Sequence, residues 1–164
     1  MTKSIIVKSI RNKGKGVFSL KDFKKDEFIF RSTKGKLIKR QNISKLSRKE
    51  QNHTTEIKSN IYELMISPAK YINHSCDPNS YVKGKFYYAM KPIKEGEEIT
   101  VDYRIGTRDR WEMKCKCGSK KCSKIVIGDF FTLKKNLQRK YLNYLPIWFK
   151  KEFSNKLKNL NIKS

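Results

Sequence analysis

Hydrophobic residues in the first half of the chain occur in short runs, interrupted by charged residues and glycines. Ser4–Ile10, Gly16–Leu20 and Glu27–Ser32 are each rich in Ile, Val or Phe. Runs of this length and composition predict β-strands. The polar stretch Ser44–His53 has little β-branching, and a short helix or an irregular insert is expected there.

The middle of the chain carries the turn signals of a hairpin. In Ser80–Pro92, aromatic and β-branched residues flank Lys83-Gly84-Lys85, which predicts two strands joined by a tight turn. Glu95-Gly96 predicts a second turn that leads into a strand at Ile99–Tyr103.

The last part of the chain changes to helical periodicity. Between Thr132 and Tyr144 the apolar residues recur at helical spacing, and Pro146 can open a second helix. The apolar positions are Leu133, Leu137, Tyr141 and Tyr144 in the first helix, and Phe149, Phe153, Leu157 and Leu160 in the second. Such stripes pack on a domain more often than they bind a partner. We therefore expect a helical tail docked on the rest of the chain.

The length of 164 residues predicts one domain with a single core. The hydrophobic fraction of 37% is low, but 9 Phe, 8 Tyr and 2 Trp supply bulky core residues. No apolar run is long enough to span a bilayer or to act as a signal peptide. We expect an intracellular monomer with no membrane contact, cytoplasmic or, in a eukaryotic host, nuclear.

The net charge of +24 arises from 39 Lys and Arg against 15 Asp and Glu. A field of this sign attracts acidic partners such as nucleic acid. Compositional drift is the alternative, because lysine, asparagine and isoleucine are also frequent in proteins encoded by AT-rich genomes. Both interpretations stay open.

Four cysteines, Cys76, Cys115, Cys117 and Cys122, are the candidate metal ligands. Four thiolates complete a tetrahedral zinc site, and Gly118 and Ser119 favour the sharp turn that a Cys-x-Cys pair requires. Two disulfides are the alternative. Zinc is favoured because nothing in the sequence points to an oxidising compartment.

Three motifs in order then indicate a family. They are Lys13-Gly14-Lys15-Gly16-Val17-Phe18, Asn73-His74-Ser75-Cys76-Asp77-Pro78-Asn79 and Glu97-Glu98-Ile99-Thr100-Val101-Asp102-Tyr103. Together they resemble the SET-domain protein lysine methyltransferases, and the cysteine cluster resembles the post-SET zinc segment of that family. The resemblance covers roughly Ser4 to Gly128, and the aromatic helical tail resembles that of compact bacterial or viral members.

The resemblance implies a mainly β fold with some α. Short β-sheets surround a pseudoknot where the second and third motifs cross, followed by a zinc-bound post-SET lid and the helical tail. The implied divisions are a SET domain at residues 4–106, a post-SET segment at 107–128 and the tail at 129–164.

The resemblance also implies methyl transfer from S-adenosylmethionine to a protein lysine, with a histone or another basic, DNA- or RNA-associated protein as substrate. Tyr103 matches the catalytic tyrosine, and Tyr81 and Val101 would line the lysine channel. The implied cofactor-binding residues are Gly14, Lys15, Gly16, Phe18, Tyr71, Asn73, His74 and Tyr103.

The chain departs from the family pattern in places. Val101 stands where Phe or Tyr is common, Lys70 where Arg is common, and Cys122-Ser123-Lys124 lacks a glycine. Residues 35–67 have no recognisable match to the pattern of the family. The rival hypothesis is a non-enzymatic basic zinc module that binds nucleic acid.

Overall fold

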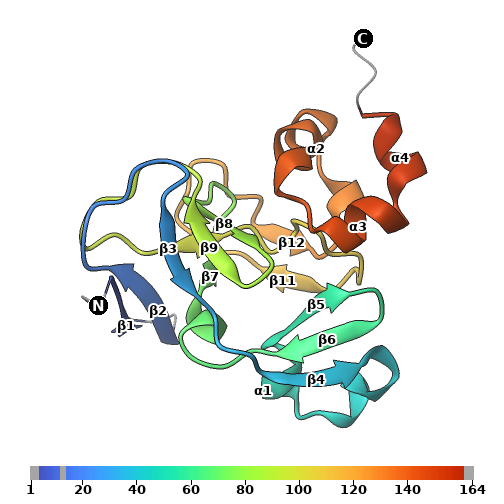
Figure 1. Cartoon of the computed structure of the whole chain (residues 1–164), viewed down its shortest axis with the longest axis horizontal. Coiled ribbons are helices and arrows are strands. Elements are labelled where there is room, and N and C mark those ends of the chain that lie inside the picture. The colour runs from blue at the N-terminus through green and yellow to red at the C-terminus, as the bar shows by residue number, and fades with distance from the viewer. Residues whose placement is uncertain (1–3, 12–13, 161–164) are drawn as a thin grey trace.

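The computed structural model describes residues 4–11 and 14–160, so Lys13 of the first motif lies outside the described residues. The chain forms small β-sheets with short helices between and after them (Figure 1). This agrees with the predicted mainly β architecture.

The predicted strands at the start of the chain are confirmed. Strands β1 (Ile5–Ile10) and β2 (Gly14–Ser19) form an antiparallel hairpin. Strand β3 (Phe28–Arg31) joins the predicted hairpin of β8 (Ser80–Lys83) and β9 (Phe86–Ala89) in a sheet with the order β3-β9-β8. Gly84 turns this hairpin with φ of 63°, a conformation that glycine adopts without steric cost.

A second three-stranded sheet, with the order β4-β6-β5, was not predicted. Its strands are β4 (Lys36–Lys39), β5 (Thr54–Lys58) and β6 (Ile61–Leu64). They are short and rich in charge, and of their residues only Ile38, Tyr62 and Glu63 are buried. The polar insert before β5 contains a 3-10 helix (Arg40–Lys45) and α1 (Arg48–Gln51), as predicted.

Two segments that are distant in the sequence lie side by side, and we call this place the crossing. After a 3-10 turn (Ala69–Tyr71), β7 (Asn73–His74) pairs in parallel with β10 (Thr100–Val101). The Asn79 side chain accepts a hydrogen bond from the Thr100 backbone amide at 2.8 Å and donates one to the Glu98 carbonyl at 2.8 Å. These bonds hold the crossing predicted from the second and third motifs.

The strand predicted at Ile99–Tyr103 is shorter than expected. It ends at Val101 because Asp102 begins a turn, in which its side chain and its carbonyl accept bonds from the backbone amides of Arg104 and Ile105. Tyr103 therefore lies in a turn and not in a strand. Beyond it, β11 (Glu112–Lys114) and β12 (Ile125–Ile127) form an antiparallel hairpin.

The helical tail is confirmed, with one correction. A 3-10 turn (Phe130–Thr132) leads to α2 (Lys135–Tyr141), and a further 3-10 turn (Leu142–Tyr144) precedes the helix that Pro146 opens. That helix is divided into α3 (Ile147–Glu152) and α4 (Ser154–Lys158), because Phe153 leaves helical geometry at φ −106°, ψ 22°.

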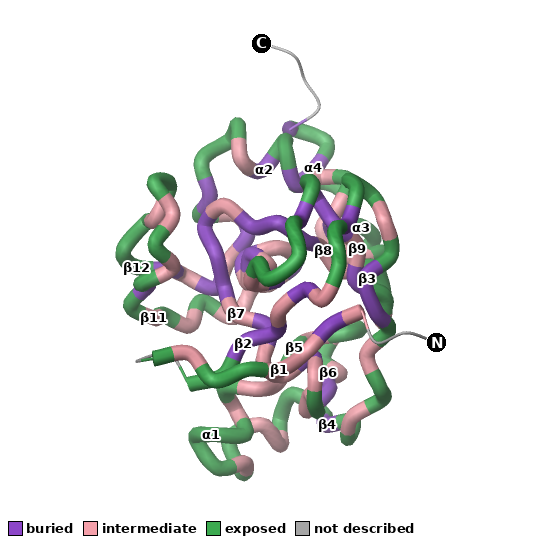
Figure 2. Tube along the Cα trace, turned by 90° about the vertical axis from the view of Figure 1, so that its left-hand side faces the viewer, coloured by how far each residue is buried: buried purple, intermediate pink, exposed green. Residues whose placement is uncertain are grey.

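The molecule has two main apolar clusters. One, which we call the sheet cluster, lies between the first hairpin and the β3-β9-β8 sheet and includes Val17, Phe30 and Ile99. The other, the tail cluster, is built on Phe130, Tyr141 and Phe149 and gathers the tail helices at one end of the molecule (Figure 1). Buried segments run through the centre of the chain trace, whereas α1 is exposed (Figure 2). The tail cluster also contains Met90 and Ile105, so the tail helices pack against the preceding part of the chain.

Candidate active site

Tyr103 lies at the crossing of the two motifs. Its side chain is half-buried, and its hydroxyl donates a hydrogen bond of 2.7 Å to the Ile72 carbonyl. Burial, and secondarily the negative charge of Glu98, raise the pKa of Tyr103 to about 12. The phenol is therefore neutral at physiological pH, and its oxygen retains lone pairs that can accept a hydrogen bond.

Asn73 connects all three motifs. Its side-chain amide donates to the Lys15 carbonyl at 3.0 Å and to the Glu98 carboxylate at 2.7 Å. Gly16 fits against this pair, since a Cβ there would lie 2.8 Å from Glu98 Oε1 and 3.2 Å from Asn73 Nδ2. Sequence reasoning identified Glu98 as part of a motif but missed its contact with Asn73, which forms only when the segments cross.

The imidazole of His74 connects the turn of Tyr103 to the cysteines. Its Nδ1 accepts a hydrogen bond from the Tyr103 backbone amide at 3.2 Å, and its Nε2 lies 3.2 Å from Cys76 Sγ. Because Nδ1 is an acceptor, the network places the proton on Nε2, which can donate to the sulfur. Burial lowers the pKa of His74 to about 4, against the opposing effect of Asp102.

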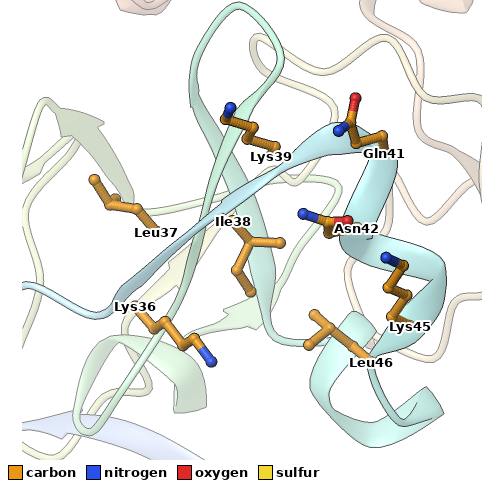
Figure 3. Close-up of a pocket in the computed structure, with 8 residues that line it drawn as sticks. All are labelled: Lys36, Leu37, Ile38, Lys39, Gln41, Asn42, Lys45 and Leu46. Atoms are coloured by element: carbon orange, nitrogen blue, oxygen red, sulfur yellow. The ribbon is translucent and has the colours of Figure 1, made fainter.

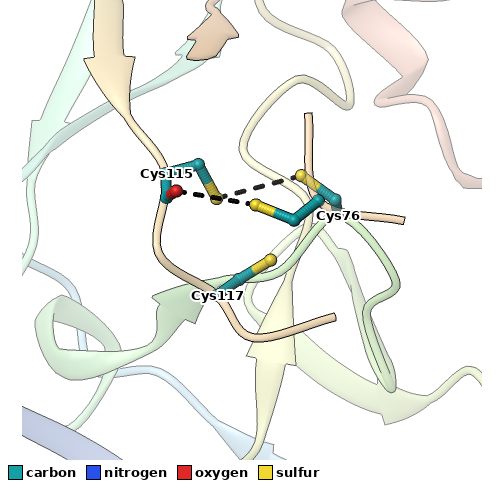
Figure 4. A group of neighbouring side chains, drawn as sticks. Cys76, Cys115 and Cys117 are labelled. Carbon is teal, nitrogen blue, oxygen red and sulfur yellow. Dashed lines mark hydrogen bonds between the residues drawn. The ribbon is translucent and has the colours of Figure 1, made fainter. Parts of the chain in front are cut away.

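The four cysteines come together as predicted. Their sulfur atoms all lie within 4.8 Å of one another, and Cys76 Sγ is 3.9 Å from Cys115 Sγ (Figure 4). All four lie among the described residues and are free thiols, without a disulfide. Tetrahedral zinc with bonds of about 2.3 Å separates its sulfur ligands by about 3.8 Å, so the cluster fits this metal. The backbone amide of Ser123 also donates a hydrogen bond of 3.4 Å to Cys76 Sγ.

A buried ion pair flanks Tyr103 on both sides along the chain. Arg104 donates to Asp102 from Nε at 2.8 Å and from Nη2 at 2.6 Å. The Tyr141 hydroxyl of the tail completes the network with a 3.2 Å bond to Asp102 Oδ2. Sequence reasoning missed this network, although the sequence neighbours Asp102 and Arg104 gave a weak signal of an ion pair.

The other predicted site residues lie in two places. Phe18 forms a β-bridge with Glu98, and the Lys15 ammonium lies 5.2 Å from the centre of the Tyr71 ring, so both are near the crossing. Val101 packs on the sheet cluster, whereas Tyr81 packs on the tail cluster. The roles of all these residues in binding cofactor or substrate stay predictions.

A surface groove of about 460 Å³ lies elsewhere, on the segment from Lys36 to Leu46 (Figure 3). It contains none of the predicted site residues. Three lysines and the apolar side chains of Leu37, Ile38 and Leu46 line it. Across residues 4–11 and 14–160, no helix has the length and apolarity that crossing a membrane requires.

Comparison with known proteins decides the family. The profile of the SET domain matches residues 14–104, more than half of the chain. The chain belongs to the SET domain family. The match begins at Gly14 and ends just after Tyr103, so it contains the crossing and the residues around it.

Relatives of this SET domain include two histone-lysine N-methyltransferases. The H3 lysine-9 specific protein of Fusarium mangiferae is 35% identical over an alignment of 85 residues that covers 39% of this chain and 25% of the relative. The H3 lysine-36 specific protein of Saccharomyces cerevisiae is 30% identical over an alignment of 139 residues that covers 72% of this chain and 18% of the relative. The chain thus spans a quarter or less of either relative.

A solved structure shares the fold. A Plasmodium falciparum protein described as a candidate histone methyltransferase superposes with a TM-score of 0.52 at 26% identity, covering 63% of this chain and 95% of its own. The predicted SET fold is therefore confirmed.

Proposed function

We propose that this protein is an S-adenosylmethionine-dependent protein lysine methyltransferase. One observation carries the proposal: where β7 pairs with β10, the Tyr103 hydroxyl donates to the Ile72 carbonyl, and the next residue, Asn73, donates to Lys15 and Glu98, so that all three motifs are in contact. The similarity to histone-lysine methyltransferases supports the same activity. The residues of the three motifs would hold S-adenosylmethionine, which when bound supplies a methyl group on a sulfonium.

Lysine methylation needs an aligned and unprotonated amine. A free lysine has a pKa of about 10.4, so the site must favour the neutral amine or give its proton a route of departure. Because the Tyr103 hydroxyl donates to the Ile72 carbonyl, its oxygen is free to accept an N–H from the substrate amine. This bond orients the nitrogen lone pair, and orientation supplies much of the acceleration in such a displacement.

Zinc has a structural role in this proposal. The four thiolates would hold one ion in a closed site that offers no position to a substrate. The metal would tie the post-SET segment, residues 107–128, to Cys76 and thus to the SET domain. Because His74 contacts both Cys76 and the Tyr103 backbone, ordering of the metal site supports the geometry at Tyr103.

The charge of the protein bears on its substrate. At +24 the chain repels an isolated basic peptide at long range. We therefore expect a histone or another basic protein to be recognised while it is bound to DNA or RNA, whose phosphates reverse the local field. Such a substrate would be met in a nucleus or in the cytoplasm.

The first test of this proposal replaces Tyr103 by phenylalanine. Removing a group that acts at the reacting centre should lower turnover by about 100-fold or more and leave cofactor affinity almost unchanged. Tyr144→Phe is the matched control, since its hydroxyl forms no hydrogen bond among the described residues. Turnover is measured with radiolabelled methyl donor and cell extract, with and without nuclease, and affinity by calorimetry.

The outcomes separate the two hypotheses. Equal turnover in Tyr103→Phe and wild type would remove Tyr103 from catalysis. Failure of the wild type to bind S-adenosylmethionine, together with tight binding to nucleic acid, would favour the non-enzymatic zinc module instead.

A further inference from the structure

The β3-β9-β8 sheet has two contrasting faces. The inner face carries Ile29, Phe30, Tyr87 and Ala89, which are buried in the sheet cluster. Register places a different set on the outer face, where Phe28 pairs with Tyr88, Arg31 with Phe86, Tyr81 with Tyr88 and Lys83 with Phe86. The outer face is therefore aromatic and basic.

The aromatic side chains of the outer face form one continuous surface. The Phe28 ring centre lies 6.2 Å from that of Phe86 and 6.0 Å from that of Tyr88, and Tyr81 stacks on Tyr88 at 5.6 Å. Tyr144 of the tail covers the Tyr81 end. The other end is open, because Phe28 is 47% exposed and Phe86 40% exposed.

The charges on this face favour an anionic partner. Strands β3, β8 and β9 contain Arg31 and Lys83 but no acidic residue, and Lys85 lies in the turn between β8 and β9. The Arg31 guanidinium lies over the Phe86 ring, 5.6 Å from its centre. Two acids contact this region: Asp26 accepts a 3.4 Å bond from Tyr81 at the covered end, and Glu63 lies 3.9 Å from the Lys85 ammonium.

We propose that the outer face of the β3-β9-β8 sheet binds single-stranded RNA. Phe28 and Phe86 stack on unpaired bases, and Arg31 and Lys83 contact the backbone phosphates. Sheets that present exposed aromatic residues bind single strands in this way, because every base offers a flat face and stacking is tolerant of sequence. Duplex RNA does not fit, since its bases are already stacked and paired. An apolar protein partner is disfavoured by the two exposed cations and by the overall charge of +24.

The test measures binding of a fluorescein-labelled, unstructured RNA of about 12 nucleotides to the full chain by fluorescence anisotropy. Phe28→Ala and Phe86→Ala should each weaken binding by about fivefold or more, which is the lower end of what stacking one base contributes. Leu37→Ala is the matched control, because Leu37 is also 47% exposed but lies on β4. Its affinity for the RNA should stay unchanged.

Three further measurements secure the interpretation. Phe28→Trp should retain or increase affinity, which separates loss of stacking from a defect in folding. Lys83→Ala should reduce the dependence of affinity on salt, because one fewer phosphate is neutralised. Tyr103→Phe should bind RNA as the wild type does, so this proposal and the catalytic one fail separately.

Two results would overturn the proposal. One is equal affinity of the RNA for wild type and for the double variant Phe28→Ala with Phe86→Ala. The other is equal affinity of the wild type for the single strand and for its duplex, since a duplex offers charge but no free base faces.

Discussion

Replacing Asp102 by asparagine removes the negative charge from the buried ion pair beside Tyr103. The exposed fractions are 3% for Asp102 and 7% for Arg104, so solvent cannot compensate the guanidinium that remains. Asparagine has almost the same shape as aspartate, and the change is therefore one of charge and hydrogen bonding. Its effect tests whether this network stabilises the turn that carries Tyr103.

The magnitude follows from the geometry. Asp102 accepts bonds from Arg104 Nε at 2.8 Å and Nη2 at 2.6 Å, and from Tyr141 at 3.2 Å. Breaking a buried pair by removing one partner costs about 3–5 kcal/mol, chiefly because a buried charge is left uncompensated. With a urea m value of about 2 kcal/mol/M, a loss of ~3 kcal/mol lowers the unfolding midpoint by about 1.5 M.

The assay is urea unfolding followed by tryptophan fluorescence, with zinc held at the same excess in all samples. Asp22→Asn is the matched control, since Asp22 forms a 2.7 Å ion pair with Lys94 on the exposed surface. Solvent screens that pair, and we expect no measurable shift of the midpoint. Combining Asp102→Asn with Arg104→Met should recover stability relative to Asp102→Asn alone, because no uncompensated charge remains.

Two observations would refute this reasoning. A midpoint for Asp102→Asn within about 0.5 M of wild type would correspond to only ~1 kcal/mol, too little for an uncompensated buried charge. A double variant less stable than the single one would show that packing, and not charge, sets the cost.

Three further predictions concern the zinc cluster, the glycine motif and the channel. Elemental analysis should find one zinc per chain, and a chelator should speed hydrogen exchange in residues 107–128; two disulfides in freshly purified protein would contradict this. Gly16→Ala should weaken S-adenosylmethionine binding by about tenfold, because its Cβ would crowd Ile10 Cδ1 at 2.5 Å and Glu98 Oε1 at 2.8 Å. Gly84→Ala strains the β8–β9 turn, at φ of 63°, and not the glycine motif, so it should leave that affinity unchanged in the same titration. Wild-type product should reach di- or trimethyl-lysine by mass spectrometry, and Val101→Tyr should shift it toward monomethyl-lysine; a wild type that stalls at the monomethyl state would refute the role of Val101.

Much of the site could be predicted from the sequence because its parts are local motifs. Residues that are neighbours in the chain determine the turn at Gly84, the hairpin around it and the strands at the start. Their sequence pattern therefore predicts these elements without knowledge of the tertiary structure. The four cysteines could likewise be recognised as candidate metal ligands, since cysteines clustered in this way most often bind a metal. Where those motifs end was less predictable, as the short strand before Tyr103 shows.

Only the tertiary structure decided the contacts between residues that are far apart in the chain. Glu98 is 25 residues from Asn73, and Tyr141 is 39 residues from Asp102. No periodic pattern in the sequence predicts a hydrogen bond over such a separation. The β4-β6-β5 sheet was not predicted because its strands bury few side chains. They are strands because they pair with one another, and their composition gives little sign of it. The exposed rings of Phe28 and Phe86 likewise share a face only because strand register aligns them.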